Sequence, residues 1–180
     1  MKKKILSLVL MLSILVSLTL LTAGCSAPAS TAKADVPKAA EALWNAGSTR
    51  DKIVVISDLH LGIDDRYTET INNIPFLIDF LKRLQSTKDV RELVIAGDFL
   101  DEWFLPVYYP VYTDQNKFYK DVIANNQDVI DELNKVIDSG IKLVYVIGNH
   151  DMTLEAEVLQ QAIPKIVQVI DAKGLGAYYT

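Results

Sequence analysis

The sequence predicts an α/β fold built on a β-α-β-α-β core whose strands run parallel. Short runs that are apolar throughout, such as 52–57 (KIVVIS) and 92–97 (ELVIAG), are typical of strands buried on both faces of a sheet. Stretches in which apolar residues follow helical spacing separate these runs. Strands that alternate with helices in this way favour a parallel sheet covered by helices on both faces.

The first half of this core is predicted as strand 52–57, helix 73–85 and strand 92–97. In the helix, Phe76, then Ile78 or Phe80, and then Leu84 have helical spacing, and Pro75 suits the first turn. The stretch that follows the second strand, EWFLPVYYPVYTDQ (102–115), is an aromatic loop. It is expected either to pack against the domain or to roof a substrate site.

A single long helix is predicted after this loop, followed by strand 142–148, helix 153–163 and strand 165–170. Gly140 suits the position just past the end of the long helix. One apolar stripe runs along that helix and comprises Phe118, Val122, Val129, Ile130, Leu133, Val136 and Ile137.

The N-terminus has the residue order of a secretory signal. Three lysines precede an apolar run from Ile5 to Leu21, and small residues follow. The alternative is an uncleaved membrane anchor, although about 17 apolar residues are at the short limit for spanning a bilayer. The segment LTAGC ends at the only cysteine, Cys25, and resembles a bacterial lipoprotein signal in which that cysteine is acylated.

That resemblance implies a lipoprotein signal peptide at 1–24, a flexible tether at 25–50 and a domain at 51–180. Cys25 would be lipidated and would become the first residue of the mature chain. The tether sequence is small, contains proline and has no periodicity. The protein is therefore expected outside the cytoplasm, attached to the cell membrane through a lipid anchor.

The charge of the mature chain limits its partners. Without the signal it carries 15 basic and 23 acidic side chains, a net charge of about −8. This argues against nucleic acid as a partner, because phosphate backbones need basic surfaces. A small phosphorylated substrate is compatible with this charge if metal ions supply positive charge. The sequence leaves the oligomeric state open.

Polar residues follow three of the predicted strands at the point where each strand ends. They are Asp58 and His60, then Asp98 and Asp101, then Asn149, His150 and Asp151. Ligands of an open parallel sheet bind beyond the carboxyl ends of its strands, so two of the aspartates, the asparagine and the two histidines are expected to form one cluster. Mixed oxygen and imidazole donors suggest manganese, iron, zinc or magnesium.

Each of these motifs has a plainer explanation when it is taken alone. Asp58 can cap a helix in a turn, Asp98 can mark a strand exit followed by a helix cap, and Asn149 suits a left-handed turn. Each motif comes directly after an apolar strand, and together they favour a metal site over three separate turns.

The motifs SDLHLG, GDFLDEW and GNHD resemble the first three motifs of the calcineurin-like metallophosphoesterase superfamily over about residues 52–152. The resemblance implies that the parallel core is the first half of an αββα sandwich of two packed sheets. It also implies a metal-dependent phosphoesterase that hydrolyses a phosphomonoester, a phosphodiester or a pyrophosphate. Two divalent ions and a bridging hydroxide would carry out the attack on phosphorus.

The same resemblance implies the metal ligands. Asp58, His60 and Asp98 would bind the first ion. Asp98 would also bridge to the second ion, which Asn149 would bind. The identity of the two ions is left open among Mn²⁺, Fe²⁺, Zn²⁺ and Mg²⁺.

The catalytic residues that it implies are His150 and Asp101. His150 would act as the acid or transition-state stabiliser near the leaving oxygen, and Asp101 would orient it. The superfamily takes further histidines from its second half, whereas this chain has two histidines and ends at Thr180. The sequence is therefore expected to be a truncated gene product or part of a longer enzyme. The alternative function is a non-catalytic lipoprotein remnant that binds a metal or a partner.

Overall fold

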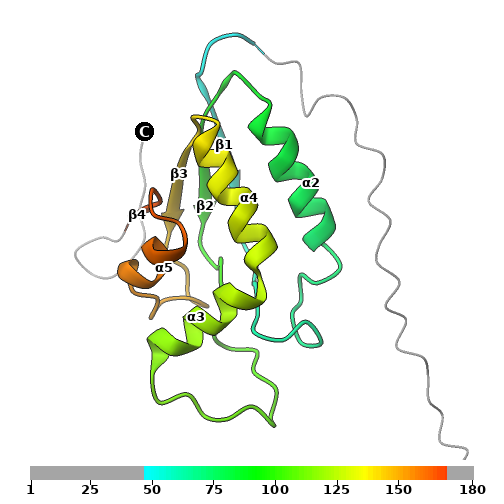
Figure 1. The fold of residues 1–180 in the computed structure, drawn as a ribbon, viewed down its shortest axis with the longest axis vertical. Coiled ribbons are helices and arrows are strands. Elements are labelled where there is room, and N and C mark those ends of the chain that lie inside the picture. Colours follow the sequence, from blue (N-terminus) through cyan, green and yellow to red (C-terminus); the bar gives the residue numbers. More distant parts are fainter. Residues whose placement is uncertain (1–46, 170–180) are drawn as a thin grey trace, which may run out of the picture. The chain divides into compact units, whose positions relative to one another are not determined.

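The computed structural model describes residues 47–169, which form a four-stranded sheet with helices packed on it (Figure 1). The predicted signal, Cys25 and residues 26–46 of the tether lie outside the described residues. Within 47–169, no helix is both long enough and apolar enough to cross a membrane. The elements follow in the order β1 (Lys52–Ile56), α2 (Ile74–Gln85), β2 (Val90–Ala96), α3 (Gln115–Asn125), α4 (Gln127–Asp138), β3 (Lys142–Val146), α5 (Ala156–Ala162) and β4 (Val167–Val169).

The sheet follows chain order, β1-β2-β3-β4, and all of its pairings are parallel. This confirms the predicted parallel α/β core. Across the two central strands, Leu93 pairs with Leu143 and Ile95 pairs with Tyr145. Because all strands run the same way, the carboxyl ends of β1, β2 and β3 lie at one edge of the sheet.

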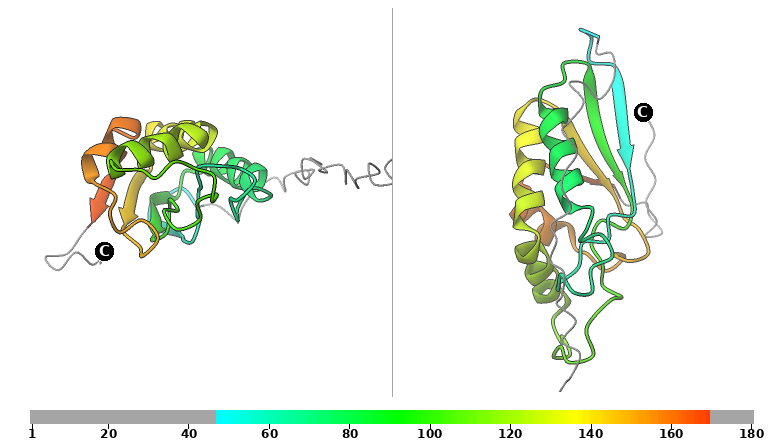
Figure 2. Two further views of the ribbon diagram at one scale, coloured as in Figure 1. Left: turned by 90° about the horizontal axis from the view of Figure 1, so that it is seen from below. Right: turned by 90° about the vertical axis from the view of Figure 1, so that its right-hand side faces the viewer.

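The described helices lie on one face of the sheet, where α2 and α4 pack against each other (Figure 2). The expectation of helices on both faces is therefore wrong for residues 47–169. Right-handed crossovers that always add the next strand on the same side place every helix on the same face. Val55 lies between two residues that contact the core under the helices, so it points to the other face, and its side chain is 61% exposed.

The core lies between the sheet and the helices. Alternate residues of the central strands point toward the helices, which follows from the two-residue period of a strand. The fully buried side chains of this core include Leu93, Ile95, Leu143 and Tyr145 from the sheet, and Leu81, Leu84, Ile130 and Val136 from α2 and α4.

The long helix that the sequence predicts is in fact two helices, because Asn126 interrupts it. Asn126 has φ −114° and ψ 30°, and its backbone N–H donates to the carbonyl of Ile123 rather than to that of Val122. Its side-chain amide donates to the carbonyls of Val122 and Gly62, both at 2.8 Å. The side chain thus replaces a helical hydrogen bond and ties the helix break to the loop after β1.

We expect Asn126→Ala to lower the free energy of unfolding by about 1–3 kcal/mol, because the substitution removes two hydrogen bonds at a buried position. The Val122 carbonyl loses its side-chain donor, and the Gly62 carbonyl keeps only the bond from Asn125. Urea unfolding followed by circular dichroism measures this change. The matched control is Asn125→Ala, because Asn125 also donates to the Gly62 carbonyl, at 3.0 Å, but is exposed. Equal losses in the two variants would contradict this account of the helix break.

Candidate metal centre

The segment that leaves β1 stays paired with the segment that leaves β2. The backbone N–H of His60 donates to the carbonyl of Asp98 at 2.9 Å, and Leu61 and Leu100 form an isolated parallel bridge. Two of the three polar motifs are thereby held side by side beyond the end of the sheet.

Three of the predicted ligands have a left-handed backbone conformation, with φ 54° at Asp58, 46° at His60 and 50° at Asp98. Within residues 47–169 they are the only residues other than glycine with positive φ. Asp and His enter this region more readily than most residues, but it still strains the backbone. Strain of this kind clusters at functional sites, where the surrounding structure enforces it.

Within residues 47–169, Asp58, His60 and Asp98 form the first of two groups that can hold a metal ion. One ligand atom from each lies within 4.8 Å of the ligand atoms of the other two. Asp58 is exposed, whereas His60 and Asp98 are partly buried, so the group opens to solvent on the side of Asp58. Two carboxylates and an imidazole suit a hard or borderline divalent ion.

The atoms of His60 show why these groups fit a metal ion better than a hydrogen-bond network. Its Nδ1 is buried and has no hydrogen-bond partner among the described residues. Its Nε2 is 3.9 Å from Asp58 Oδ1, which is also too far for a hydrogen bond. The ring nitrogens of His60 thus lie close to carboxylate oxygens without forming hydrogen bonds to them, so a nitrogen lone pair is available to a cation.

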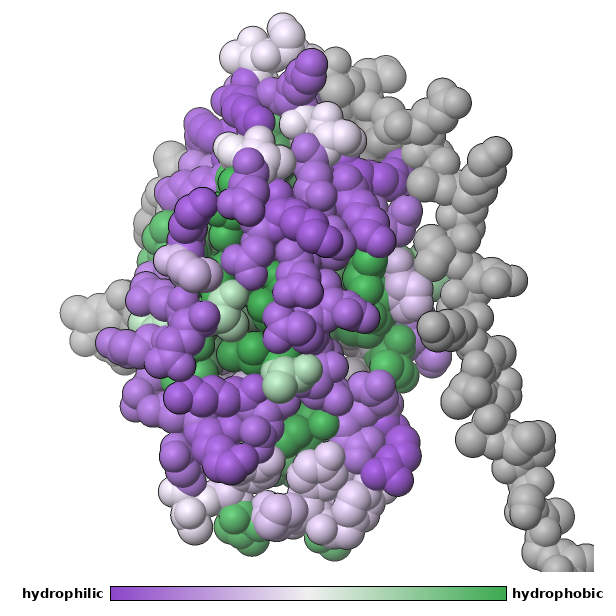
Figure 3. All heavy atoms as spheres, viewed as in Figure 1, coloured by the Kyte–Doolittle hydropathy of each residue, from purple (hydrophilic) through white to green (hydrophobic). Residues whose placement is uncertain are grey.

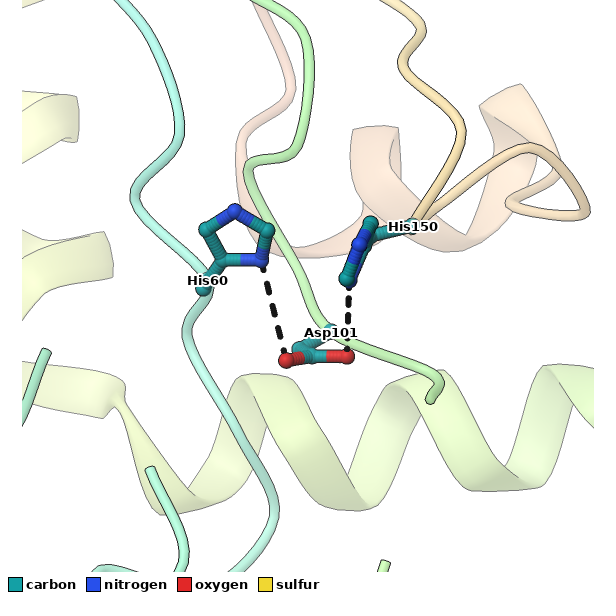
Figure 4. A group of neighbouring side chains, drawn as sticks. All are labelled: His60, Asp101 and His150. Atoms are coloured by element: carbon teal, nitrogen blue, oxygen red, sulfur yellow. Dashed lines mark hydrogen bonds and ion pairs between the residues drawn. The ribbon is translucent and has the colours of Figure 1, made fainter. Parts of the chain in front are cut away.

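The second group consists of His60, Asp101 and His150, with the carboxylate of Asp101 between the two imidazoles (Figure 4). Asp101 Oδ1 is 3.3 Å from His150 Nδ1, and Asp101 Oδ2 is 3.7 Å from His60 Nδ1. The two imidazole rings are nearly perpendicular, with centroids 4.4 Å apart. The structure thus brings Asp101 to His150, where sequence reasoning expected it, and also to His60, which sequence reasoning did not foresee.

Trp103 is a further neighbour of His150 that the sequence did not reveal. Asp101 Oδ1 accepts the backbone N–H of Trp103 at 2.8 Å and that of Phe104 at 3.2 Å. The resulting turn lays the Trp103 indole on the His150 imidazole, with centroids 4.0 Å apart and planes inclined by 27°. Asp101 therefore orders both the histidine and the aromatic ring that covers it. The sequence signals were that Trp103 follows Asp101 by two residues and belongs to the aromatic loop expected to pack on the domain or roof a site.

Asp151, to which sequence reasoning gave no role, joins the ends of β2 and β3. Its fully buried carboxylate accepts the backbone N–H of Phe99 at 2.7 Å and of Leu100 at 3.2 Å through Oδ2, and that of Gly148 at 2.8 Å through Oδ1. Burial raises the pKa of Asp151, and the hydrogen bonds that it accepts oppose this shift. Its position in GNHD was the only signal in the sequence.

The same two strand ends also meet at Gly148. Asp98 Oδ1 accepts the backbone N–H of His150 at 2.9 Å, and a Cβ at position 148 would lie 2.2 Å from that oxygen. Only glycine permits this approach. Asn149 lies on the same turn and is exposed.

We expect Asp151→Asn to lower the free energy of unfolding by about 2–3 kcal/mol, because an amide has a single oxygen and cannot accept backbone N–H groups at both ends. Thermal or urea unfolding measures the loss. Asp138→Asn is the control, since the Asp138 side chain is 70% exposed and should change stability little. Equal stability of the two variants would show that the buried carboxylate does not hold the strand ends together.

Residues 51–177 match one family of proteins, the calcineurin-like phosphoesterases. A search among curated proteins finds none that matches the chain. The matched residues contain all four described strands and both groups of potential metal ligands. The family is one of metal-dependent phosphoesterases, and the edge of the sheet carries side chains able to hold such a metal. The chain therefore belongs to the calcineurin-like phosphoesterase family.

Proposed function

We propose that the protein hydrolyses a phosphate ester or pyrophosphate at the edge of the sheet where β1, β2 and β3 end. The observation that carries this proposal is that two groups share His60, one with Asp58 and Asp98 and the other with Asp101 and His150. The first group offers metal ligands and the second offers a residue for proton transfer. Because they share a side chain, both act on the same bound molecule.

Asp58, His60 and Asp98 would hold one divalent ion, and Asp98 with Asn149 would contribute to a second. Asp98 suits the shared position because its carboxylate is already oriented by the backbone N–H of His150. When bound, such ions lower the pKa of a water molecule and neutralise charge on the phosphoryl oxygens. Mn²⁺, Fe²⁺, Zn²⁺ and Mg²⁺ all suit this set of oxygen and imidazole donors.

His150 would deliver a proton to the departing oxygen. Its Nδ1 faces Asp101 Oδ1 at 3.3 Å, so its Nε2 is the nitrogen left to meet the substrate. Asp101 and Trp103 together fix the plane of the ring, one through its edge and the other through its face. A proton donor that is already held in one orientation loses little conformational entropy when it meets the leaving oxygen.

The proposed location is outside the cytoplasm, with the domain attached to the membrane through Cys25. The order of lysines, apolar run and cysteine at the N-terminus supports this part of the proposal. The acidic balance of the chain supports a small phosphorylated substrate rather than a nucleic acid.

The second candidate is a non-catalytic lipoprotein that binds a metal ion or a partner. One observation favours it: His60 belongs to both groups described above, so the described residues offer one shared imidazole for metal binding. A single weak site for Mn²⁺, with no turnover of any phosphate ester, would favour this candidate over an enzyme.

Asp98→Ala is expected to lower the Mn²⁺-stimulated hydrolysis of p-nitrophenyl phosphate by the full-length protein by more than about 100-fold. Removing a residue that only hydrogen-bonds a metal ligand typically lowers activity by about 10–100-fold, and removing the ligand itself should lower it further. Titration calorimetry with Mn²⁺ measures the metal site without relying on turnover. Asp65→Ala is the matched control, because Asp65 is an exposed carboxylate that belongs to neither group. A folded Asp98→Ala protein as active as this control would show that the metal site is assigned wrongly.

The two histidines should fail in different ways. His150→Gln is expected to lower turnover by about 10²–10⁴-fold while Mn²⁺ still binds, because a proton donor is lost and the ligands stay. His60→Gln is expected to weaken Mn²⁺ binding itself. Turnover and calorimetry on the same preparations distinguish these outcomes. Equal losses of Mn²⁺ affinity in the two variants would contradict the division of roles between the two groups.

A further inference from the structure

We propose that residues 103–113, here named the uncharged loop, dock onto a lipid surface. The eleven residues WFLPVYYPVYT carry no charged side chain, in a chain of which 23% is charged. The loop begins at Trp103, which stacks on His150, and it lies within the connection between β2 and α3. The uncharged loop therefore lies next to the proposed active site.

Several apolar side chains of the uncharged loop face solvent, whereas Tyr109 and Tyr112 pack against the core. Val107 and Val111 are 104% and 90% exposed, the highest values among the large hydrophobic residues described. Trp103, Phe104 and Tyr108 are each about half exposed. Figure 3 shows this end of the molecule as pale and green residues below the hydrophilic helices. Exposed apolar residues gathered in one place mark a surface that another phase or molecule covers.

The loop has a fixed shape rather than a collapsed one. The backbone N–H of Tyr109 donates to the carbonyl of Pro106 at 2.9 Å, which closes a turn with Val107 and Tyr108 at its tip. The hydroxyl of Tyr108 donates to Asp64 at 3.1 Å, and the Arg66 guanidinium lies 5.2 Å from the centre of its ring. Docking a tip that is already ordered loses little conformational entropy.

A lipid surface fits this loop better than a charged partner does. Tryptophan and tyrosine beside aliphatic residues are the composition that proteins place at the boundary between lipid tails and headgroups. The chain is acidic, so anionic lipids would not attract it, and docking would rest on apolar insertion. Apolar insertion predicts binding that needs no anionic lipid and persists at high salt.

A cavity of about 350 Å³ lies behind the tip and offers room for part of an apolar chain. Leu105, Val107, Tyr109 and Val111 of the loop line it, together with Phe118 of α3. The cavity reaches Glu102, whose backbone N–H donates to the carbonyl of His150 at 3.0 Å. An acyl chain seated there would lie next to the turn that carries the proposed proton donor.

The N-terminus of the chain makes this docking geometrically feasible. The domain enters the sheet at the start of β1, at the opposite end of the molecule from the loop (Figure 1). The 26 residues from Cys25 to Arg50 have a contour length of at most about 90 Å, which exceeds the length of a domain this size. A chain held at a membrane by its N-terminus can therefore bring the uncharged loop to that membrane.

One consequence rests on the proposed function: the enzyme would act on phosphorylated molecules presented at a lipid surface. Trp103 belongs to the loop and also stacks on His150, so docking would bring the site to the level of the lipid headgroups. The docking itself does not depend on any catalytic activity.

The test uses protein in which Cys25→Ser removes the only native cysteine, so that a single label can be placed. This substitution also removes the proposed lipid anchor, so any docking of the tip to vesicles occurs without it. Val107→Cys places an environment-sensitive fluorophore (NBD) at the tip, and Lys82→Cys places it on the exposed face of α2 as the matched control. Both proteins are mixed with phosphatidylcholine vesicles with and without brominated acyl chains. We expect quenching by brominated lipid at position 107 and little at position 82, unchanged between 0.1 and 1 M salt.

A second variant separates docking from general attachment of the N-terminus. Val111→Asp, added to the Val107→Cys protein, should reduce its quenching to the level of the Lys82→Cys control, because a charge opposes insertion of the tip. Equal quenching at positions 107 and 82, or quenching at 107 that Val111→Asp leaves unchanged, would overturn the proposal. So would a label at 107 that is protected from iodide but not quenched by brominated lipid, since that pattern means that another protein copy covers the loop.

Discussion

The carboxylate of Asp151 fixes the ends of β2 and β3 to each other, and the geometry of the metal centre depends on that link. It accepts three backbone N–H groups, two from the segment after β2 and one from the turn after β3. Burying a carboxylate is unfavourable, and hydrogen bonds to its charged form offset the loss of water. The same arrangement sets Asp98, which accepts the His150 N–H, and Asp101, which faces the His150 ring.

The sequence was sufficient to predict the strands, their direction and the edge at which polar residues gather. Continuous apolar runs identify strands without knowledge of their neighbours, and helices between them require parallel pairing. Parallel strands end at a common edge, so Asp58, His60 and Asp98 could be expected together before any coordinate was known. The metal-binding role of Asn149 stays a prediction.

Other features could not be predicted because they depend on contacts between distant residues. Asn126 divides the long helix, and its side-chain amide donates a hydrogen bond to the carbonyl of Gly62, which lies 64 positions earlier. The stacking of Trp103 on His150 joins segments from two strand ends, and no local pattern encodes it. That the described helices cover one face follows from strand order, which apolar runs alone do not specify. In each case the sequence predicts a local helix, strand or loop, whereas contacts between distant residues determine where it ends or what it packs against.

The left-handed backbone at Asp58, His60 and Asp98 has a consequence for how this chain can vary. A residue other than glycine in that conformation costs about 1 kcal/mol or more, whereas glycine adopts it freely. Selection for thermal stability alone would therefore favour glycine at three positions that offer metal ligands. Stability and activity oppose each other at these sites, so the most heat-resistant variants should include ones that have lost the metal centre.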